Sequence, residues 1–174
     1  GVRLVGSEMC IRDSTQTLNA LTAPDQTFAF TEELHSSGVT YREFINIPKT
    51  LANFFEYGLM FPEWEFVVFE DERYTYQDIH NKAAQAANAF VSAGVKKGDR
   101  VAICMANNPE YIICYMALTS MGAVCVLLNS WWVPDEVSYG LENSQAKILV
   151  ADQKRLSGLE KFQDVQKIIV RPDS

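Results

Sequence analysis

Apolar positions between residues 48 and 171 recur with two spacings, one typical of helices and the other of strands. Helical spacing predicts helices over residues 48–60, 76–93 and 109–120, another that begins at residue 134, and a further helical segment over 153–163. Short apolar runs predict strands at 65–69, 73–75, 100–105, 123–128, 147–151 and 165–170. The two element types alternate, and the central strands are apolar on both faces. The predicted fold class is therefore α/β, with a parallel sheet covered by helices on both faces.

Local signals support several of these boundaries. Thr75 stands three residues before Asp78, a capping-box pattern that predicts the start of a helix. Asn108 followed by Pro109 predicts another start, with Asn108 as the cap. Gly94 and Gly122 predict the ends of these two helices.

The first 47 residues lack this organisation. Residues 1–14 have no sustained period and resemble a peptide translated from sequencing-adapter bases, so we expect them to be artefactual and disordered; a natural N-terminal strand is the alternative. Residues 15–47 are polar and mixed, which predicts an N-terminal extension of low order. Residues 48–174 then form the domain that carries the predicted sheet.

Composition excludes several classes of protein. The chain has 174 residues with a net charge of −7, and 48% of its residues are hydrophobic, which argues against a disordered chain and against a nucleic-acid binder. No apolar run is long enough to span a bilayer, and no leader-like segment opens the chain. The cysteines have no CxxC spacing and no neighbouring histidine, so we expect no metal site, no disulfide framework and a cytoplasmic location.

The common catalytic fingerprints are missing from the sequence. It contains no G-x-G-x-x-G, no phosphate-binding P-loop, no G-x-S-x-G and no H-E-x-x-H motif. We interpret His80 and the three cysteines after residue 100 as structural. No catalytic residue and no metal ligand is assigned.

Ligands of open α/β sheets bind outside the carboxyl ends of the strands, which here are residues 106–108, 129–132 and 152–155. Trp131 and Trp132 stand side by side in the second of these loops, where they either stack on a ligand or pack against another part of the protein. Residues 147–171 hold six bases and three acids within an acidic chain. Those bases either contact an anionic ligand or form a solvated helix face.

Four segments resemble motifs of the adenylate-forming acyl-CoA synthetases, the AMP-binding or ANL superfamily. Residues 73–79 (RYTYQDI) resemble the family's L-T-Y-x-E-L, and residues 93–102 (AGVKKGDRVA) are similar to G-V-x-x-G-D-R-V-A. Residues 107–111 (NNPEY) resemble N-s-x-E-y, and residues 118–129 resemble A-x-x-x-G-A-v-x-v-P-l-N, with Leu128 at the usual proline. The motifs stand in family order, and the resemblance covers about residues 48–171.

The resemblance implies the first sub-domain of the acyl-CoA synthetase N-terminal domain. Members of this family activate a carboxylic acid with ATP and Mg²⁺ as an acyl-adenylate and then transfer the acyl group to CoA. A medium- or long-chain fatty acid is the expected substrate. An aryl acid or a luciferase-like or carrier-loading reaction is the alternative within the family, and a free-standing flavodoxin-like binding module or a non-catalytic homologue is the alternative outside it. A homodimer is left open.

The resemblance also bears on the site. The family's phosphate loop, adenine and ribose motifs and catalytic lysine would follow Ser174, so we expect a truncated piece that is inactive alone. By position, the loops that border CoA in the acetyl-CoA branch fall on five residues, for which CoA binding is predicted: Asn129, Ser130, Trp131, Lys154 and Arg155.

Overall fold

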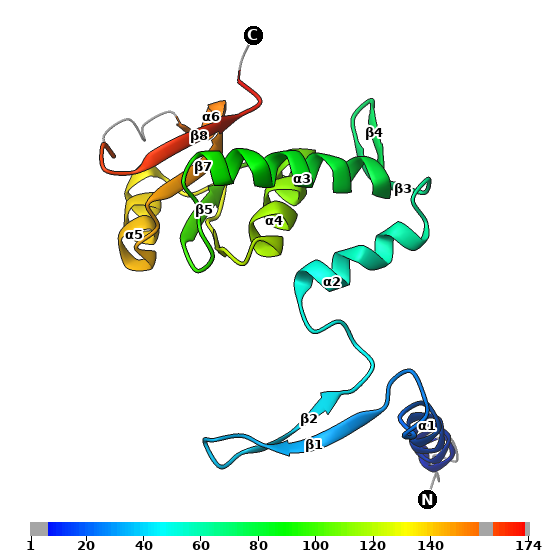
Figure 1. Ribbon diagram of the computed structural model, residues 1–174. Coiled ribbons are helices and arrows are strands. Elements are labelled where there is room, and N and C mark those ends of the chain that lie inside the picture. The colour runs from blue at the N-terminus through cyan, green and yellow to red at the C-terminus, as the bar shows by residue number, and fades with distance from the viewer. Residues whose placement is uncertain (1–6, 157–161, 173–174) are drawn as a thin grey trace, which may run out of the picture. The chain divides into compact units, whose positions relative to one another are not determined.

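The computed structural model describes residues 7–156 and 162–172, and it divides the chain into two compact units, residues 1–49 and 50–174 (Figure 1). This division falls close to the boundary expected after residue 47.

The first unit consists of α1 (Ser7–Leu21) and an antiparallel hairpin of β1 (Phe30–Leu34) and β2 (Thr40–Phe44). This corrects two expectations, because residues 7–14 are helical rather than disordered and residues 15–47 contain regular structure. No glycine or proline occurs between residues 7 and 23, so nothing interrupts the helix. Gly38, with φ of +82°, makes the tight turn of the hairpin. Residues 1–6 lie outside the described residues, and an adapter origin for residues 1–14 stays a prediction.

The second unit begins with α2 (Leu51–Glu56), which continues into a short 3₁₀ turn, η1 (Tyr57–Met60). The helix predicted over 48–60 therefore starts three residues later, because the Thr50 hydroxyl accepts a hydrogen bond from Asn53 N (3.1 Å) and caps it. The predicted hairpin is present as β3 (Glu65–Phe69) and β4 (Glu72–Thr75).

The predicted capping box opens α3 (Tyr76–Ser92). Asp78 N donates to Thr75 Oγ1 (3.1 Å), and Thr75 N donates to Asp78 Oδ2 (2.9 Å). The helix ends before Gly94, whose φ of +90° is a conformation that only glycine adopts at little cost. Both boundary predictions for this helix are confirmed.

The described residues then form a four-stranded parallel sheet in the order β6-β5-β7-β8. Its elements follow in the chain as β5 (Arg100–Cys104), α4 (Pro109–Ser120), β6 (Val124–Leu127), α5 (Pro134–Ser144), β7 (Ile148–Asp152), α6 (Gln153–Leu156) and β8 (Gln166–Val170). The predicted fold class is confirmed. Of the helix predicted over 153–163, residues 157–161 lie outside the described residues.

The side-chain cap predicted at the start of α4 is not formed. Asn108 precedes α4, as expected, but its side chain makes no capping hydrogen bond. Within the described part of the chain its buried Oδ1 has no hydrogen-bond partner. Pro109 occupies the first helical position, where its missing N–H costs nothing, and Tyr111 N donates to the Asn108 backbone carbonyl (3.0 Å) rather than to the Asn108 side chain.

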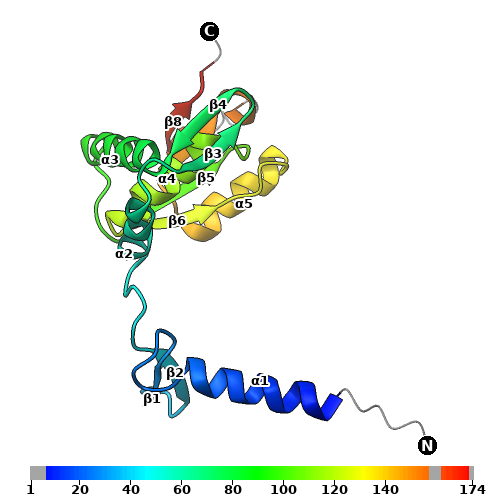
Figure 2. The ribbon, with the colours of Figure 1, turned by 90° about the vertical axis from the view of Figure 1, so that its right-hand side faces the viewer.

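Helices cover both faces of the sheet, as Figure 2 shows for α3 on one side of the strands and α5 on the other. Val101 and Ile103 of β5 are buried on the side of α3 and α4, whereas Ala102 and Cys104 are buried on the side of α5. β6 lies on one side of β5, and the next strand in the chain, β7, lies on the other side. Right-handed crossovers therefore place α4 and α5 on opposite faces and open a crevice outside the carboxyl ends of β5 and β7.

Candidate functional site

A hollow of about 240 Å³ lies at the carboxyl ends of the strands, in the place that the topology favours. Its walls come from the end of β5, the loop after β6, the start of α5 and the segment after β7. The lining residues are Cys104, Ser130, Trp131, Trp132, Pro134, Val137, Lys154 and Arg155. Residues at or after the ends of three strands far apart in the sequence thus meet at one small site.

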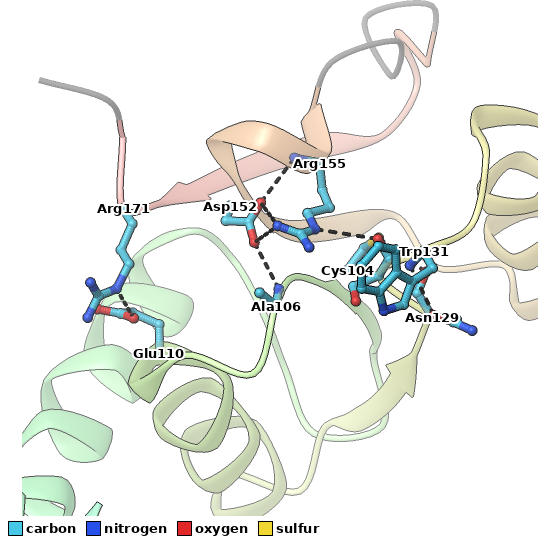
Figure 3. A network of polar contacts seen from close by, with 9 residues as sticks. Cys104, Ala106, Glu110, Asn129, Trp131, Asp152, Arg155 and Arg171 are labelled. Carbon is cyan, nitrogen blue, oxygen red and sulfur yellow. Dashed lines mark hydrogen bonds and ion pairs between the residues drawn. The ribbon is translucent and has the colours of Figure 1, made fainter. Parts of the chain in front are cut away.

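The loop after β6 presents Trp131 at the rim of the hollow (Figure 3). Asn129 Oδ1 accepts a hydrogen bond from Trp131 N (3.0 Å), and the Asn129 carbonyl accepts one from Trp132 N (3.1 Å). These contacts form a turn of the kind that asparagine favours. Trp131 is 86% exposed while its backbone is fixed, so its ring is available for stacking.

The segment after β7 supplies two cations that differ in their surroundings. Lys154 is exposed and, among the described residues, has no ion-pair partner. Arg155 is half-buried, with Nη1 placed 3.2 Å from Asp152 Oδ2 and Nε donating to the Ser130 carbonyl at 3.4 Å (Figure 3). The two neighbouring bases are therefore not equivalent.

Asp152 is the residue whose role the sequence analysis missed. The residue is buried at 6% exposure, and its carboxylate accepts hydrogen bonds from Ala106 N (2.8 Å) and Arg155 N (3.0 Å) in addition to the guanidinium. It thereby joins the loop after β5 to the segment after β7. An acid at the end of an apolar strand, three residues before an arginine, was the available signal.

Cys104 lines the hollow but is poorly suited to act as a nucleophile there. Burial raises the pKa of its thiol, and the negative charge of Asp152 raises the pKa further, against a smaller opposing effect of Arg155. The thiol is therefore protonated at neutral pH, whereas the thiolate is the reactive form. The described part of the chain also contains no cluster of histidine, cysteine or acidic residues arranged to hold a metal ion.

The structure brings together four of the five predicted CoA-binding residues. Ser130, Trp131, Lys154 and Arg155 line one hollow, whereas Asn129 is not among its lining residues and shapes the turn. Their convergence is a property of the structure, and CoA binding stays a prediction. Chemically, the site offers an exposed indole, one uncompensated cation and a carbonyl-bound guanidinium.

Comparison with known proteins assigns the family. Residues 54–174 match the family described as AMP-binding enzyme, and the chain belongs to this family. The resemblance read from the sequence motifs is thereby confirmed.

Relatives and solved structures agree with this assignment. The crotonobetaine/carnitine–CoA ligase of Escherichia coli is 38% identical over 78 residues, which are 45% of this chain and 15% of that ligase. The anthranilate CoA ligase AuaEII, solved with anthranoyl-AMP, superposes with a TM-score of 0.67 at 21% identity, over 72% of this chain and 26% of the other. The Mycobacterium tuberculosis fatty acyl CoA synthetase has a TM-score of 0.65 at 24% identity, over 70% and 26%.

The superpositions show a shared fold, that of the N-terminal domain of acyl-CoA ligases. The chain covers about a quarter of each solved relative and less of the curated one. Within the described residues, no helix is both long and apolar enough to cross a membrane.

Proposed function

We propose that this chain forms part of an ATP-dependent acid–CoA ligase. The family match over residues 54–174 carries the proposal, and CoA ligases among the relatives support it. A carboxylate is a poor electrophile until AMP becomes its leaving group, so ATP activates the acid before the thiol of CoA attacks. A bound Mg²⁺ would supply neutralisation of the polyphosphate charge, and the described residues include no cluster that would hold it.

The hollow at the strand ends is our candidate for the CoA nucleotide. The exposed face of Trp131 suits stacking against adenine, and Lys154 suits a phosphate group in an otherwise acidic chain. The arrangement supports this role because both side chains line the same hollow, Trp131 from the loop after β6 and Lys154 from α6.

For the acid we propose a medium- or long-chain fatty acid, with an aryl acid as the alternative. The relatives are named for carnitine, anthranilate and fatty acyl substrates, so the choice needs a direct comparison. We also propose a cytoplasmic location, which the free thiols of Cys104, Cys114 and Cys125 support because a reducing compartment preserves them.

Acid-dependent exchange of pyrophosphate into ATP tests the activity. The enzyme that contains this chain is assayed with octanoate, palmitate, anthranilate and carnitine, and then with CoA to complete the reaction. We expect exchange with octanoate or palmitate and formation of the acyl-CoA. Exchange with anthranilate alone would favour the aryl alternative, and no exchange with any acid would contradict the proposed class of reaction.

Tryptophan substitution tests the candidate CoA site. Trp131→Ala should weaken CoA binding by about fivefold or more, as expected for the loss of one stacking contact of about 1–3 kcal/mol. Trp64→Ala is the matched control, because Trp64 is also exposed (62%) and does not line the hollow. Equal effects of the two substitutions on CoA binding would contradict the proposal that the hollow is the CoA site.

A further inference from the structure

A second hollow, of about 510 Å³, lies near the start of the second unit and is mostly apolar. It is bounded by α2 and η1, by β3, and by α3 and α4. Six of the residues that line it are aromatic: Phe54, Phe55, Tyr57, Phe61, Phe66 and Tyr76. A smaller hollow of about 200 Å³ adjoins it, because Phe55, His80 and Met116 line both. Neither hollow shares a residue with the candidate CoA site.

The apolar side chains around this hollow are left uncovered by the described residues. Neither α2 nor η1 contains a buried residue. Phe55 packs against the core formed by α3 and α4, whereas Phe54 on the same helix stays 59% exposed. A helix normally covers its apolar side, and a contiguous exposed apolar surface marks an interaction site. We call this surface the aromatic face and define it by its exposed residues: Phe54, Tyr57, Met60, Phe61, Trp64 and Phe66.

The backbone beneath the aromatic face is fixed by hydrogen bonds. His80 Nε2 donates to the Phe55 carbonyl at 2.8 Å and holds α2 on α3. Trp64 N donates to the Phe61 carbonyl (3.0 Å), and Tyr76 N donates to the Trp64 carbonyl (3.1 Å). The rings of Phe61 and Trp64 stack with their centroids 4.4 Å apart. Side chains held in this way lose little freedom when a partner binds, so the surface is preformed.

Uncompensated negative charge borders the aromatic face. Residues 51–72 hold six acids and no base. Glu65 and Glu72 are paired with arginines from other segments. The remaining four acids are exposed and form no ion pair with any residue that the structure describes: Glu56, Glu63, Glu70 and Asp71. Glu56 lines the smaller hollow, and Glu63 lies in the turn between Phe61 and Trp64.

Charge and size together select the occupant. Acids at the border repel an anionic bilayer, and a two-fold dimer through this surface would bring the same acids of two copies together. A hollow of about 510 Å³ holds several apolar side chains, which is more than a single small cation would fill. A protein segment with apolar side chains and flanking lysines or arginines matches both the rings and the acids.

We propose that the aromatic face binds an amphipathic helix of a partner protein. The apolar side of that helix enters the hollow, and its lysines or arginines lie against Glu56 and Glu63. Met60 and Met116 are flexible and polarisable, so the surface accommodates apolar side chains of different shape. This binding goes beyond the acid–CoA ligase reaction and does not depend on it.

Fluorescence anisotropy tests the apolar half of the proposal. A labelled synthetic helix with leucines on one side and lysines on the other is titrated with the 174-residue chain. Phe54→Gln should weaken binding by about fivefold or more, because one central apolar contact is lost. Phe54 is exposed, so the variant should keep its circular dichroism spectrum. Tyr139→Gln is the matched control, since Tyr139 is an exposed aromatic residue of α5 outside both hollows, and it should leave binding unchanged.

Two double variants test the charged half. Glu56→Gln with Glu63→Gln should weaken binding by about threefold at low salt, and the difference should vanish at high salt. Asp25→Asn with Glu33→Gln removes the same charge from exposed positions of the first unit and should have no effect. A leucine helix with glutamates in place of the lysines should not bind.

Several outcomes would overturn the proposal. Equal affinity for the two synthetic helices, or binding that survives Phe54→Gln, would show that the aromatic face does not select a basic helix. A dimer in sedimentation velocity that Phe54→Gln abolishes would assign the surface to a second copy, and binding to phosphatidylserine vesicles that Phe54→Gln abolishes would assign it to a bilayer. A helix that binds the 174-residue chain but not the enzyme that contains it would show that the rest of that enzyme covers the surface.

Discussion

Arg171 Nε donates to Glu110 Oε2 at 2.5 Å and so joins the residue after β8 to the first turn of α4 (Figure 3). Its Nη2 also donates to Glu72 Oε1 at 2.6 Å, and Glu72 lies at the start of β4. Hydrogen bonds from Tyr74 and then from Arg171 lower the pKa of Glu72. One guanidinium therefore links the antiparallel hairpin, a helix N-terminus and the edge of the parallel sheet.

Replacing this guanidinium should loosen the hairpin. Arg171→Met leaves Glu72 and Glu110 as two carboxylates without their shared cation, so we expect the Tm to fall by several degrees, equivalent to about 1 kcal/mol. Thermal unfolding followed by circular dichroism measures this. Arg100→Met is the control, because the exposed Arg100 bonds an amide oxygen of Gln145 rather than a carboxylate. Equal shifts in the two variants would show that the contacts of Arg171 add no particular stability.

The buried thiols should make stability fall at alkaline pH. Burial raises the pKa of Cys114 to about 12 and that of Cys125 to about 11. Above pH 9 the unfolded thiols lose protons that the folded thiols keep. The free energy of unfolding therefore decreases with rising pH, by about 1.4 kcal/mol per pH unit for each thiol.

Urea unfolding at pH 8, 9.5 and 10.5 tests this, with Cys125→Ala as the reference protein that lacks one of the two thiols. The variant should lose stability less steeply than the wild type between pH 9 and 11. Parallel pH dependences in the two proteins would mean that Cys125 does not titrate differently on folding.

Removal of residues 1–14 should leave the second unit intact. This unit has its own core, and all three tryptophans, Trp64, Trp131 and Trp132, belong to it. Tryptophan fluorescence therefore reports on the unfolding of residues 50–174, and its midpoint should be the same with and without residues 1–14. A shift of several degrees would show that the deleted residues stabilise this unit.

The capping box offers a local test of α3. Thr75→Ala removes the hydroxyl that accepts from Asp78 N and should cost about 1 kcal/mol. Thr119→Ala is a suitable comparison, because its hydroxyl donates to the Tyr115 carbonyl inside α4 and caps nothing. A smaller loss for Thr75→Ala than for Thr119→Ala would argue against the capping role.

The strands, the helix starts and the strand-end loops could be predicted because each has a local cause. Thr75 and Asp78 satisfy each other over three residues, and apolar runs such as residues 100–104 indicate strands buried on both faces. The hairpin of residues 30–44 escaped prediction, since its strands are mostly exposed and carry few apolar residues facing a core.

Arg155 shows where local reasoning stops. Its sequence neighbourhood is basic, which suggested a cation for a phosphate, but its charge is balanced by Asp152 and its Nε is held by the Ser130 carbonyl, 25 residues away. Such a contact depends on the order of the strands in the sheet. The sequence pattern indicates that strands exist, and only the fold determines which loops meet.

The parallel pairing of β5 with β7 places Cys104 opposite Ala151, and therefore sets Ala106 within reach of Asp152. Insertion of one residue into either strand would displace the following loop by about 3.3 Å and turn every later side chain to the other face. Cys104 would then point to the opposite face of the sheet, and the Asp152 carboxylate would lose the hydrogen bond from Ala106 N. Related chains should consequently vary in the residues of this hollow while keeping the lengths of these two strands, because the spacing along them is harder to change than the side chains themselves.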